Sequence, residues 1–355
     1  MSRSSEKTIL VINSGDGTGL NFTRSLELAG GYRTVGIDTT VEDFHTSEAH
    51  SKHFLVWEDP AELVEAVNTI ADKEGADLIY AADTSPQLMA ICERREDLIR
   101  PTLLPDKSDH WLMEDKWATW VALEGAGLPV PATILATDRE SIAGFMRKHA
   151  DIWLRRRRGS GGSGALATAS LPLAQAWLDE HRGWQEFTVA ERLTTRTATF
   201  SGLWYEGDLV CSQLRERLSW KYPSATASGV TGVTGAQHTL WDEYLHDLAI
   251  RCVRATCVRP HGIIGVDFTF DREGNPLPTE VQPARFYSSI FFLARVGVNF
   301  PDLYCRLALN ELDKPLKPSV NPIRDRRYWV KAVDRLPQLL SAEDFHRATP
   351  EKTGA

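Results

Sequence analysis

The sequence predicts an α/β protein that is built from more than one structural unit. Strands and helices alternate through the first hundred residues, an arginine-rich strand leads into a glycine loop near residue 160, and two later apolar strands carry acidic side chains. The chain has 355 residues, which is longer than one typical domain. We therefore expect two or three units, each with a core of its own.

The composition excludes several classes of protein. With 42% hydrophobic residues and 11 Trp the chain is typical of a globular protein, and its net charge of −8 argues against a protein that coats nucleic acid or anionic membranes. The five cysteines form no C-x-x-C pair, so they predict neither a disulfide framework nor a zinc site. The first residues lack a signal-peptide core, and no run reaches the ~18 apolar residues that span a bilayer. We expect a cytoplasmic protein with reduced thiols.

The first hundred residues have the βαβ pattern of a parallel sheet. Strands are expected at 8–13, 33–38 and 77–83, with helices at 21–30 and 59–74. The loop Ser14–Gly19 follows the first strand, but its glycines are spaced G-x-G-x-G rather than G-x-G-x-x-G. Because Asp38 at the end of the second strand would suit a ribose contact, a nicotinamide-dependent oxidoreductase stays open as an alternative.

The middle of the chain predicts a phosphate-binding loop. A helix from Asp115 to Gly127 and an extended segment with two prolines precede a helix at 138–149 and a strand that ends in Arg155–Arg158. The loop Gly159–Gly164 follows, and a further helix is expected at 171–182. A run with almost no side chains lets several backbone N–H groups point at one anion, and the arginines add a local basic site. The loop lacks the Gly-Lys-Ser/Thr ending of a Walker loop. A flexible hairpin beside solvated arginines is the alternative.

Acidic side chains converge on two predicted neighbouring strands, 263–270 and 277–283. Asp267 lies in the first strand, Glu280 and Gln282 share one face of the second, and a short turn joins the two strands. An oxygen-only set of this kind suits Mg²⁺ that is bound together with ATP phosphates. Three residues further on, Arg285 can place a guanidinium at a transferring phosphoryl group.

Two arginines, Arg215 and Arg217, open a segment at 215–239 that we expect to be a loop. Arginines beside aromatic residues and a small-residue loop suit an anionic or planar carboxylate substrate, and Ser288 can face the same pocket. Surface arginines beside a flexible loop are the alternative. His45, His50 and His53 have no acidic or cysteine partner nearby in sequence, so we do not expect a metal there. No G-x-S-x-G or H-E-x-x-H motif supports a hydrolase.

Taken together, these motifs resemble ATP-grasp enzymes, in particular the branch of the carbamoyl-phosphate synthase large subunit and its carboxylate–amine ligase relatives. The resemblance covers residues 8–310 and includes Asp115–Lys116, the glycine loop, the GVDF and EVQPARF strands and Gly297–Asn299. It implies an ATP-grasp fold with a Rossmann-like pre-ATP-grasp domain at 1–105. A lid subdomain at 106–185, a metal-binding subdomain at 186–312 and a C-terminal tail of unassigned role at 313–355 would follow.

The resemblance also implies roles for individual residues. ATP would be held by residues of four segments, which are the helix that begins at Asp115, the arginine-rich strand, the glycine loop and a hinge strand. These residues are Lys116, Arg155, Gly159, Ser160, Gly161, Gly162, Ser163, Gly164, Glu186, Phe187, Val189 and Glu191. Arg155 stands where the family usually has a lysine, and Glu191 would contact the ribose. Asp267, Glu280 and Gln282 would hold one or two Mg²⁺ ions, with Mn²⁺ as a substitute. The third ligand is normally an asparagine.

The implied activity is that of an ADP-forming carboxylate–amine ligase, which makes an amide or peptide bond through an acyl phosphate. Arg285 and Arg217 would act in catalysis, and Arg215, Arg217 and Ser288 would bind the substrate. The expected partners are a small-molecule carboxylate and an amine, without nucleic acid or membrane, and a homodimer is compatible with the family. The alternatives are an NAD(P)-dependent oxidoreductase and a nucleotide-binding protein without turnover. The sequence does not identify the two substrates.

Overall fold

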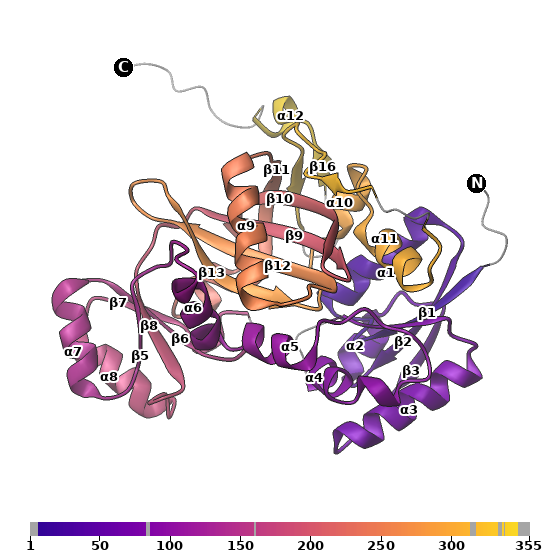
Figure 1. Cartoon of the computed structure of the whole chain (residues 1–355), viewed down its shortest axis with the longest axis horizontal. Helices are drawn as coiled ribbons and strands as arrows, with labels where there is room; N and C mark the ends of the chain where they lie inside the picture. The colour runs from indigo at the N-terminus through magenta and orange to yellow at the C-terminus, as the bar shows by residue number, and fades with distance from the viewer. Residues whose placement is uncertain are drawn as a thin grey trace.

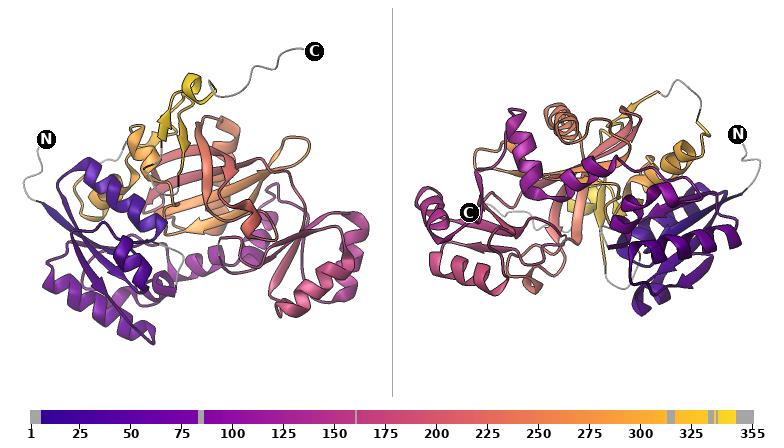
Figure 2. Two further views of the ribbon diagram at one scale, coloured as in Figure 1. Left: turned by 180° about the vertical axis from the view of Figure 1, so that it is seen from behind. Right: turned by 60° about the horizontal axis from the view of Figure 1, so that its bottom comes forward.

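In the computed structural model, which describes residues 6–82, 86–159, 161–312, 317–332, 336 and 338–346, the strands form three β-sheets. Figure 1 shows an N-terminal sheet, a lid sheet and a large central sheet. In both views of Figure 2 the N-terminal sheet and the lid sheet flank the central sheet on different sides. The predicted α/β class is confirmed. None of the described helices is long and apolar enough to cross a membrane.

The N-terminal sheet is parallel, with the strand order β3-β2-β1-β4. Its elements are β1 (Lys7–Ile12), α1 (Gly17–Ala29), β2 (Tyr32–Asp38), α2 (Val41–Thr46), β3 (Ser51–Phe54), α3 (Pro60–Lys73), β4 (Leu78–Ala81), α4 (Pro86–Glu93) and the 3₁₀ turn η1 (Arg95–Asp97). The helix starts follow capping rules, because Asp16 accepts hydrogen bonds from two backbone N–H groups of α1 and Asp59 does so for α3, which has Pro60 in its first turn. The sequence prediction did not include α2 and β3, which are short and mostly solvent-facing.

The lid sheet is antiparallel, with the strand order β5-β8-β6-β7. Two helices, α5 (Lys107–Glu114) and α6 (Lys116–Gly125), lead into it. Its own elements are β5 (Thr133–Leu135), α7 (Arg139–Lys148), β6 (Ile152–Arg156), β7 (Leu166–Thr168), α8 (Leu171–Glu180) and β8 (Phe187–Glu191). Helices α7 and α8 and one face of the sheet share a small core around Phe187.

The central sheet has the order β13-β12-β9-β10-β11-β15-β16, and β14 pairs with β10. Its elements are β9 (Thr197–Tyr205), β10 (Asp208–Trp220), η2 (Pro223–Ala225), β11 (Thr234–Leu240), α9 (Glu243–Thr256), β12 (Gly262–Phe270), β13 (Pro276–Pro283), α10 (Phe291–Arg295), α11 (Phe300–Ala308), β14 (Ser319–Val320), β15 (Tyr328–Val330), β16 (Gln338–Leu340) and α12 (Ala342–His346).

The expected loop at 215–239 is wrong at both of its ends. Strand β10 continues to Trp220 and β11 begins at Thr234, so only residues 221–233, here called the hairpin loop, leave the sheet. Polar composition suggested a loop, but Arg215 is only 4% exposed because a second layer of the protein covers this face of the strand.

The C-terminal tail is part of the central sheet rather than an appendage. β15 pairs with β11, and Trp329 in β15 lies opposite Gln237. The Trp329 side chain is 1% exposed and packs against Phe291 and Phe292 of α10. The tail therefore completes the hydrophobic core between the central sheet and α10, and it reaches the face of the sheet that carries Arg215.

The two faces of the central sheet differ. Helix α9 lies across one face (Figure 1), where Leu245 and Leu248 join Phe200 and Val266 in an apolar core. The other face is apolar at one end, where Leu203 and Ile263 pack with residues of α10 and α11. At its other end this second face becomes polar. Five of the predicted site residues lie on that polar end: Arg215, Arg217, Asp267, Glu280 and Gln282.

Candidate active site

One row of side chains crosses four adjacent strands of the central sheet. Glu280 of β13 lies opposite Asp267 of β12, Asp267 lies opposite Thr199 of β9, and Thr199 lies opposite Arg215 of β10. Residues directly opposite each other project from the same face of a sheet. The four residues, called the register row below, therefore share the polar face, with two carboxylates at one end and a guanidinium at the other.

The acidic end of the row contains two of the three predicted metal ligands, and the third, Gln282, lies beside it on the same face of β13. Thr199 Oγ1 donates to Asp267 Oδ1 at 2.6 Å, and Gln282 Nε2 donates to Asp267 Oδ2 at 2.8 Å. Burial raises the pKa of Glu280, but the charges of nearby cations outweigh burial, so the pKa of this carboxyl lies below its usual value. These cations are Lys116, Arg155 and Arg285. Glu280 is therefore ionised at neutral pH.

The donor set fits a magnesium ion that shares its coordination with phosphate oxygens. Two carboxylates and an amide from paired strands supply oxygen ligands. Gln282 directs its Nε2 at Asp267, so its side-chain amide would have to rotate by 180° to present Oε1 to the metal. Within the described ranges, no group of three His, Cys, Asp or Glu residues could hold a metal by itself. Mg²⁺ at this place would complete its coordination with water or phosphate oxygens.

Lys116 joins the glycine loop to the acidic strand. Its Nζ donates to the carbonyl oxygen of Gly159 at 2.7 Å and lies 3.4 Å from Glu280 Oε1. The residue begins α6, and the N-cap Asp115 is held by Arg157 through two hydrogen bonds of 3.1 and 2.6 Å. The pair of Asp115 and Arg157 thus fixes the position from which the Lys116 ammonium reaches the site.

The arginine run at 155–158 does not form a single basic cluster, because its side chains contact different parts of the protein. The partners are the Thr279 carbonyl for Arg155, the Phe187 ring and the His181 carbonyl for Arg156, the Asp115 carboxylate for Arg157, and the Trp111 ring with the same carboxylate for Arg158. Arg155 has the carboxylates of the register row among its electrostatic partners. This is the arginine that the sequence predicts as a nucleotide anchor.

The glycine loop packs against the hairpin loop. Gly161, Gly162 and Gly164 adopt φ values of 68°, 72° and 69°, which favour glycine. A Cβ atom at Gly162 would lie 2.3 Å from the carbonyl oxygen of Val230, and a Cβ atom at Gly232 would lie 2.8 Å from Gly161 Cα. Gly159 and Ser163 are exposed in the same loop, and Ser160 lies outside the described residues. The two loops can therefore approach only because both are glycine-rich.

We expect Gly162→Ala to open this contact and Gly161→Ala to preserve more of it. Both changes carry the cost of a positive φ, about 1–2 kcal/mol, but only the Gly162 variant adds a clash with backbone. Trypsin cleavage after Arg158 measures opening of the loop, and it should be several-fold faster in Gly162→Ala than in Gly161→Ala. Equal cleavage rates in the two variants would contradict the packing of the two loops.

The predicted hinge residues lie apart from the register row. β8 is an interior strand, so the backbone of Phe187 and Val189 pairs with β5 and β6, and both side chains are fully buried in the lid core. Glu186 is exposed in the turn before β8, and Glu191 Oε1 accepts a hydrogen bond from the Ala132 N–H at 2.8 Å. The contacts of these residues with adenine stay a prediction. Spacing along the sequence does not reveal which strands lie inside a sheet.

The predicted substrate residues do come together. Arg217 donates to Thr197 and Thr234 and stacks on Trp220, and burial followed by the charge of Arg215 lowers the pKa of Arg217 to about 9. The Arg215 guanidinium lies 4.0 Å from the centre of the Tyr287 ring, which adjoins Ser288. The alternative of solvated surface arginines is therefore wrong for Arg215.

The N-terminal glycine loop uses Asp38 for its own structure. Asp38 is fully buried and accepts hydrogen bonds from the Gly15 N–H and from Ser14 Oγ. A ribose contact would have to break these bonds, which weakens the nicotinamide alternative. The loop nevertheless borders the central sheet, because a Cβ atom at Gly17 would lie 3.4 Å from the Cβ of Ser288.

Two of the three histidines that the sequence sets aside have polar partners within the N-terminal unit. His50 Nδ1 lies 3.0 Å from Thr34 Oγ1, and His53 Nε2 lies 2.8 Å from Glu74 Oε1. The His50 contact holds the segment before β3 against β2. The His53 contact holds β3 against the end of α3.

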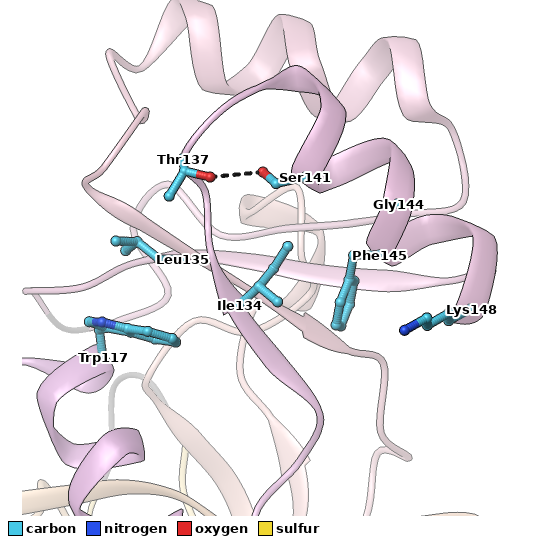
Figure 3. A pocket seen from close by; sticks show the side chains of 8 residues that line it. All are labelled: Trp117, Ile134, Leu135, Thr137, Ser141, Gly144, Phe145 and Lys148. Atoms are coloured by element: carbon cyan, nitrogen blue, oxygen red, sulfur yellow. Dashed lines mark hydrogen bonds between the residues drawn. The ribbon is translucent and has the colours of Figure 1, made fainter.

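A cavity of about 480 Å³ lies on the lid (Figure 3). Figure 3 shows the apolar side chains of Ile134 and Phe145 at its centre, with Trp117 and Lys148 at its two ends. No predicted site residue lines this cavity. The candidate site is therefore defined by charge and register rather than by cavity volume.

The comparisons with known proteins point to one fold. No family model and no curated protein matches the sequence. Among solved structures, N5-carboxyaminoimidazole synthetase from Staphylococcus aureus with ADP aligns at a TM-score of 0.69 and 14% identity over 94% of this chain and 84% of that chain. The biotin carboxylase domain of 2-oxoglutarate carboxylase from Hydrogenobacter thermophilus aligns at 0.68 and 15% identity, over 93% of this chain and 75% of that one.

An L-amino acid ligase from Bacillus licheniformis aligns at a TM-score of 0.66 and 15% identity, over 92% of this chain and 80% of that chain. At such low identities the likeness concerns the fold, and all three alignments span nearly the whole chain. The chain therefore has the ATP-grasp fold that the sequence predicts.

Proposed function

We propose that the protein is an ADP-forming ligase that joins a carboxylate to an amine. The observation that carries the proposal is the acidic end of the register row, where ionised Glu280 faces the cations Lys116, Arg155 and Arg285 and lies opposite Asp267 on an ATP-grasp fold. Both signs of charge are needed there, because a nucleotide brings a metal ion and phosphate oxygens to the same place.

The residues of this site have separate tasks in the proposal. Asp267, Glu280 and Gln282 would hold Mg²⁺ or Mn²⁺, which neutralises charge on the terminal phosphates when it is bound. Lys116 and Arg155 bind the phosphates, and the backbone N–H groups of the glycine loop cover them. Contact of this loop with the hairpin loop keeps water away from the reacting groups.

The proposed reaction has two balanced steps. A carboxylate oxygen forms a bond to the γ-phosphorus of ATP while the bond from that phosphorus to ADP breaks. The amine nitrogen then bonds to the acyl carbon, phosphate leaves with the former carboxylate oxygen, and the nitrogen loses a proton. Arg285 stabilises the phosphoryl oxygens, and Arg217 orients the substrate.

The structural neighbours support a small-molecule reaction of this class. One neighbour from Aspergillus clavatus contains ADP and an aminoimidazole ribonucleotide, and the Hydrogenobacter neighbour is a dimer that contains MgADP and bicarbonate. We propose small carboxylate and amine substrates for this chain, with a cytoplasmic location and a homodimer as accompanying predictions.

Release of ADP and phosphate tests the proposal. We expect Mg²⁺, ATP and a panel of carboxylic acids with amines to yield ADP and phosphate in equal amounts with at least one pair. ATP binding without ADP release across the panel would favour the nucleotide-binding protein without turnover. Thermal stabilisation by NADH but not by ATP would contradict the ligase and favour the oxidoreductase.

A further inference from the structure

We propose that Lys331 and Arg215 form a second anion subsite, so that the carboxylate substrate carries a further anionic group, either a carboxylate or a phosphate. This inference rests on the proposed function and specifies the substrate class of the same site. It assigns a role in specificity to the C-terminal tail, which the sequence analysis left without one.

Lys331 is held in place by backbone groups on both sides of the site. It follows β15, and its N–H donates to the Gly235 carbonyl of β11 at 2.8 Å. Its Nζ donates to the Ser288 carbonyl at 3.0 Å. The side chain projects from the same face as Trp329, two residues earlier, which lies opposite Gln237. Gln237 lies opposite Arg217, so the tail places an ammonium group on the face that carries the register row.

Arg215 is a buried cation whose hydrogen-bonding partners are neutral. Its NH1 group donates to Thr234 Oγ1 and to the side-chain oxygen of Gln237, its plane covers the Tyr287 ring, and its buried Nε has no hydrogen-bonding partner among the described residues. In the described part of the chain, no carboxylate oxygen lies within 4.0 Å of a charged nitrogen of Arg215, Arg217 or Lys331. Asp267 attracts Arg215 from across the sheet but does not contact it. Burying a charge without a contacting counter-ion is costly, so an anionic ligand would supply the missing partner.

The groups that face Lys331 come from three elements. Arg215 faces it from β10 and Arg24 from α1, while the segment after β13 contributes the Ser288 carbonyl and Tyr287. Arg24 is paired with Glu48, whereas the Tyr287 hydroxyl is buried without a partner among the described residues. Burial raises the pKa of Tyr287, so this hydroxyl stays neutral and can donate to an anion.

The register row gives the spacing between the two anionic groups of the substrate. Asp267 and Arg215 are separated by two strand spacings, or roughly 10 Å, because Thr199 of β9 lies between them. One carboxylate would react near Asp267, while the second group would bind at Arg215 and Lys331. Dicarboxylic acids and phosphorylated carboxylic acids of several bonds in length fit this spacing.

Thermal unfolding of the full chain with anions tests the subsite without ATP. At matched ionic strength, we expect glutarate and inorganic phosphate to raise the melting temperature of the wild type more than acetate does. Lys331→Met should weaken the apparent affinity at least tenfold, which corresponds to about 1.4 kcal/mol. Lys331→Arg should retain most of it, and Lys317→Met, an exposed lysine of the same tail, should behave as the wild type. Equal affinities of the wild type and Lys331→Met would overturn the subsite.

The pH dependence of anion affinity gives an independent readout. Burial, followed by the charges of Arg215 and Arg24, lowers the pKa of Lys331 to about 8. The protonated ammonium binds the anion, so affinity should fall as pH rises from 7 to 9 in the wild type. Lys331→Arg keeps its charge in this range and should show a much flatter profile. Identical profiles for the two proteins would contradict the role of Lys331.

The subsite and the ligase can fail separately. If glutarate or phosphate stabilises the wild type through Lys331 but ATP does not bind, the proposed ligase fails while the anion site stands. If acids with two anionic groups drive ADP release no better than monocarboxylates, the substrate class is wrong while the ligase stands. The stronger of glutarate and phosphate in the thermal series decides between a dicarboxylic and a phosphorylated substrate.

Discussion

Glu280→Gln should reduce ADP formation by a factor of 100 or more while the protein stays folded. The change removes the charge that faces three cations at the acidic end of the register row, where Lys116 Nζ lies 3.4 Å from Glu280 Oε1. An amide at this position lacks the negative charge that attracts Mg²⁺ and balances the three cations, and loss of one oriented group at a phosphoryl-transfer site typically costs two to three orders of magnitude. ADP release and circular dichroism measure the two parts of this prediction.

Glu273→Gln is the matched control, because Glu273 is exposed in the turn between β12 and β13. It makes the same chemical change a few residues away and should leave ADP formation unchanged. Wild-type turnover in Glu280→Gln would show that the metal assignment is wrong. Loss of activity in both variants would instead place the effect in the β12–β13 pair as a whole.

Trp329→Ala should lower the free energy of unfolding by about 3–5 kcal/mol, the usual cost of replacing a buried tryptophan with alanine. Its side chain is 1% exposed, and its ring centre lies 5.5 Å from that of Phe292. Since Trp329 also fixes the strand that precedes Lys331, anion affinity should fall together with stability. Urea unfolding measures the first effect.

Trp241→Ala provides the comparison, because Trp241 is 41% exposed at the start of α9 and should cost well under half as much. A cost below 1 kcal/mol for Trp329→Ala would show that the tail is not part of the core. Such a result would also remove the structural support for a tail residue in the substrate site.

The local features of this chain were predictable from sequence because they depend on short-range rules. The parallel N-terminal sheet follows from its βαβ pattern, and the pairing of Asp267 with Glu280 follows from two strands joined by a short turn. The likeness to ATP-grasp structures confirms the fold that these motifs predict.

The remaining features depend on contacts between distant segments. The 215–239 segment looked like a loop because its arginines are polar, yet Tyr287 and Gln237 cover Arg215 within the sheet. The hinge prediction placed adenine contacts on β8, whose interior position depends on pairing with β5 and β6. The position of Lys331 in the proposed substrate site depends on the pairing of β15 in the tail with β11, which lies nearly one hundred residues earlier in the chain.

Isothermal titration of the full chain with ATP, with and without Mg²⁺, tests the central claim most directly. The account predicts that ATP binds in the presence of Mg²⁺, that EDTA weakens binding at least tenfold, and that NADH does not bind. Binding of NADH without binding of ATP would contradict the account.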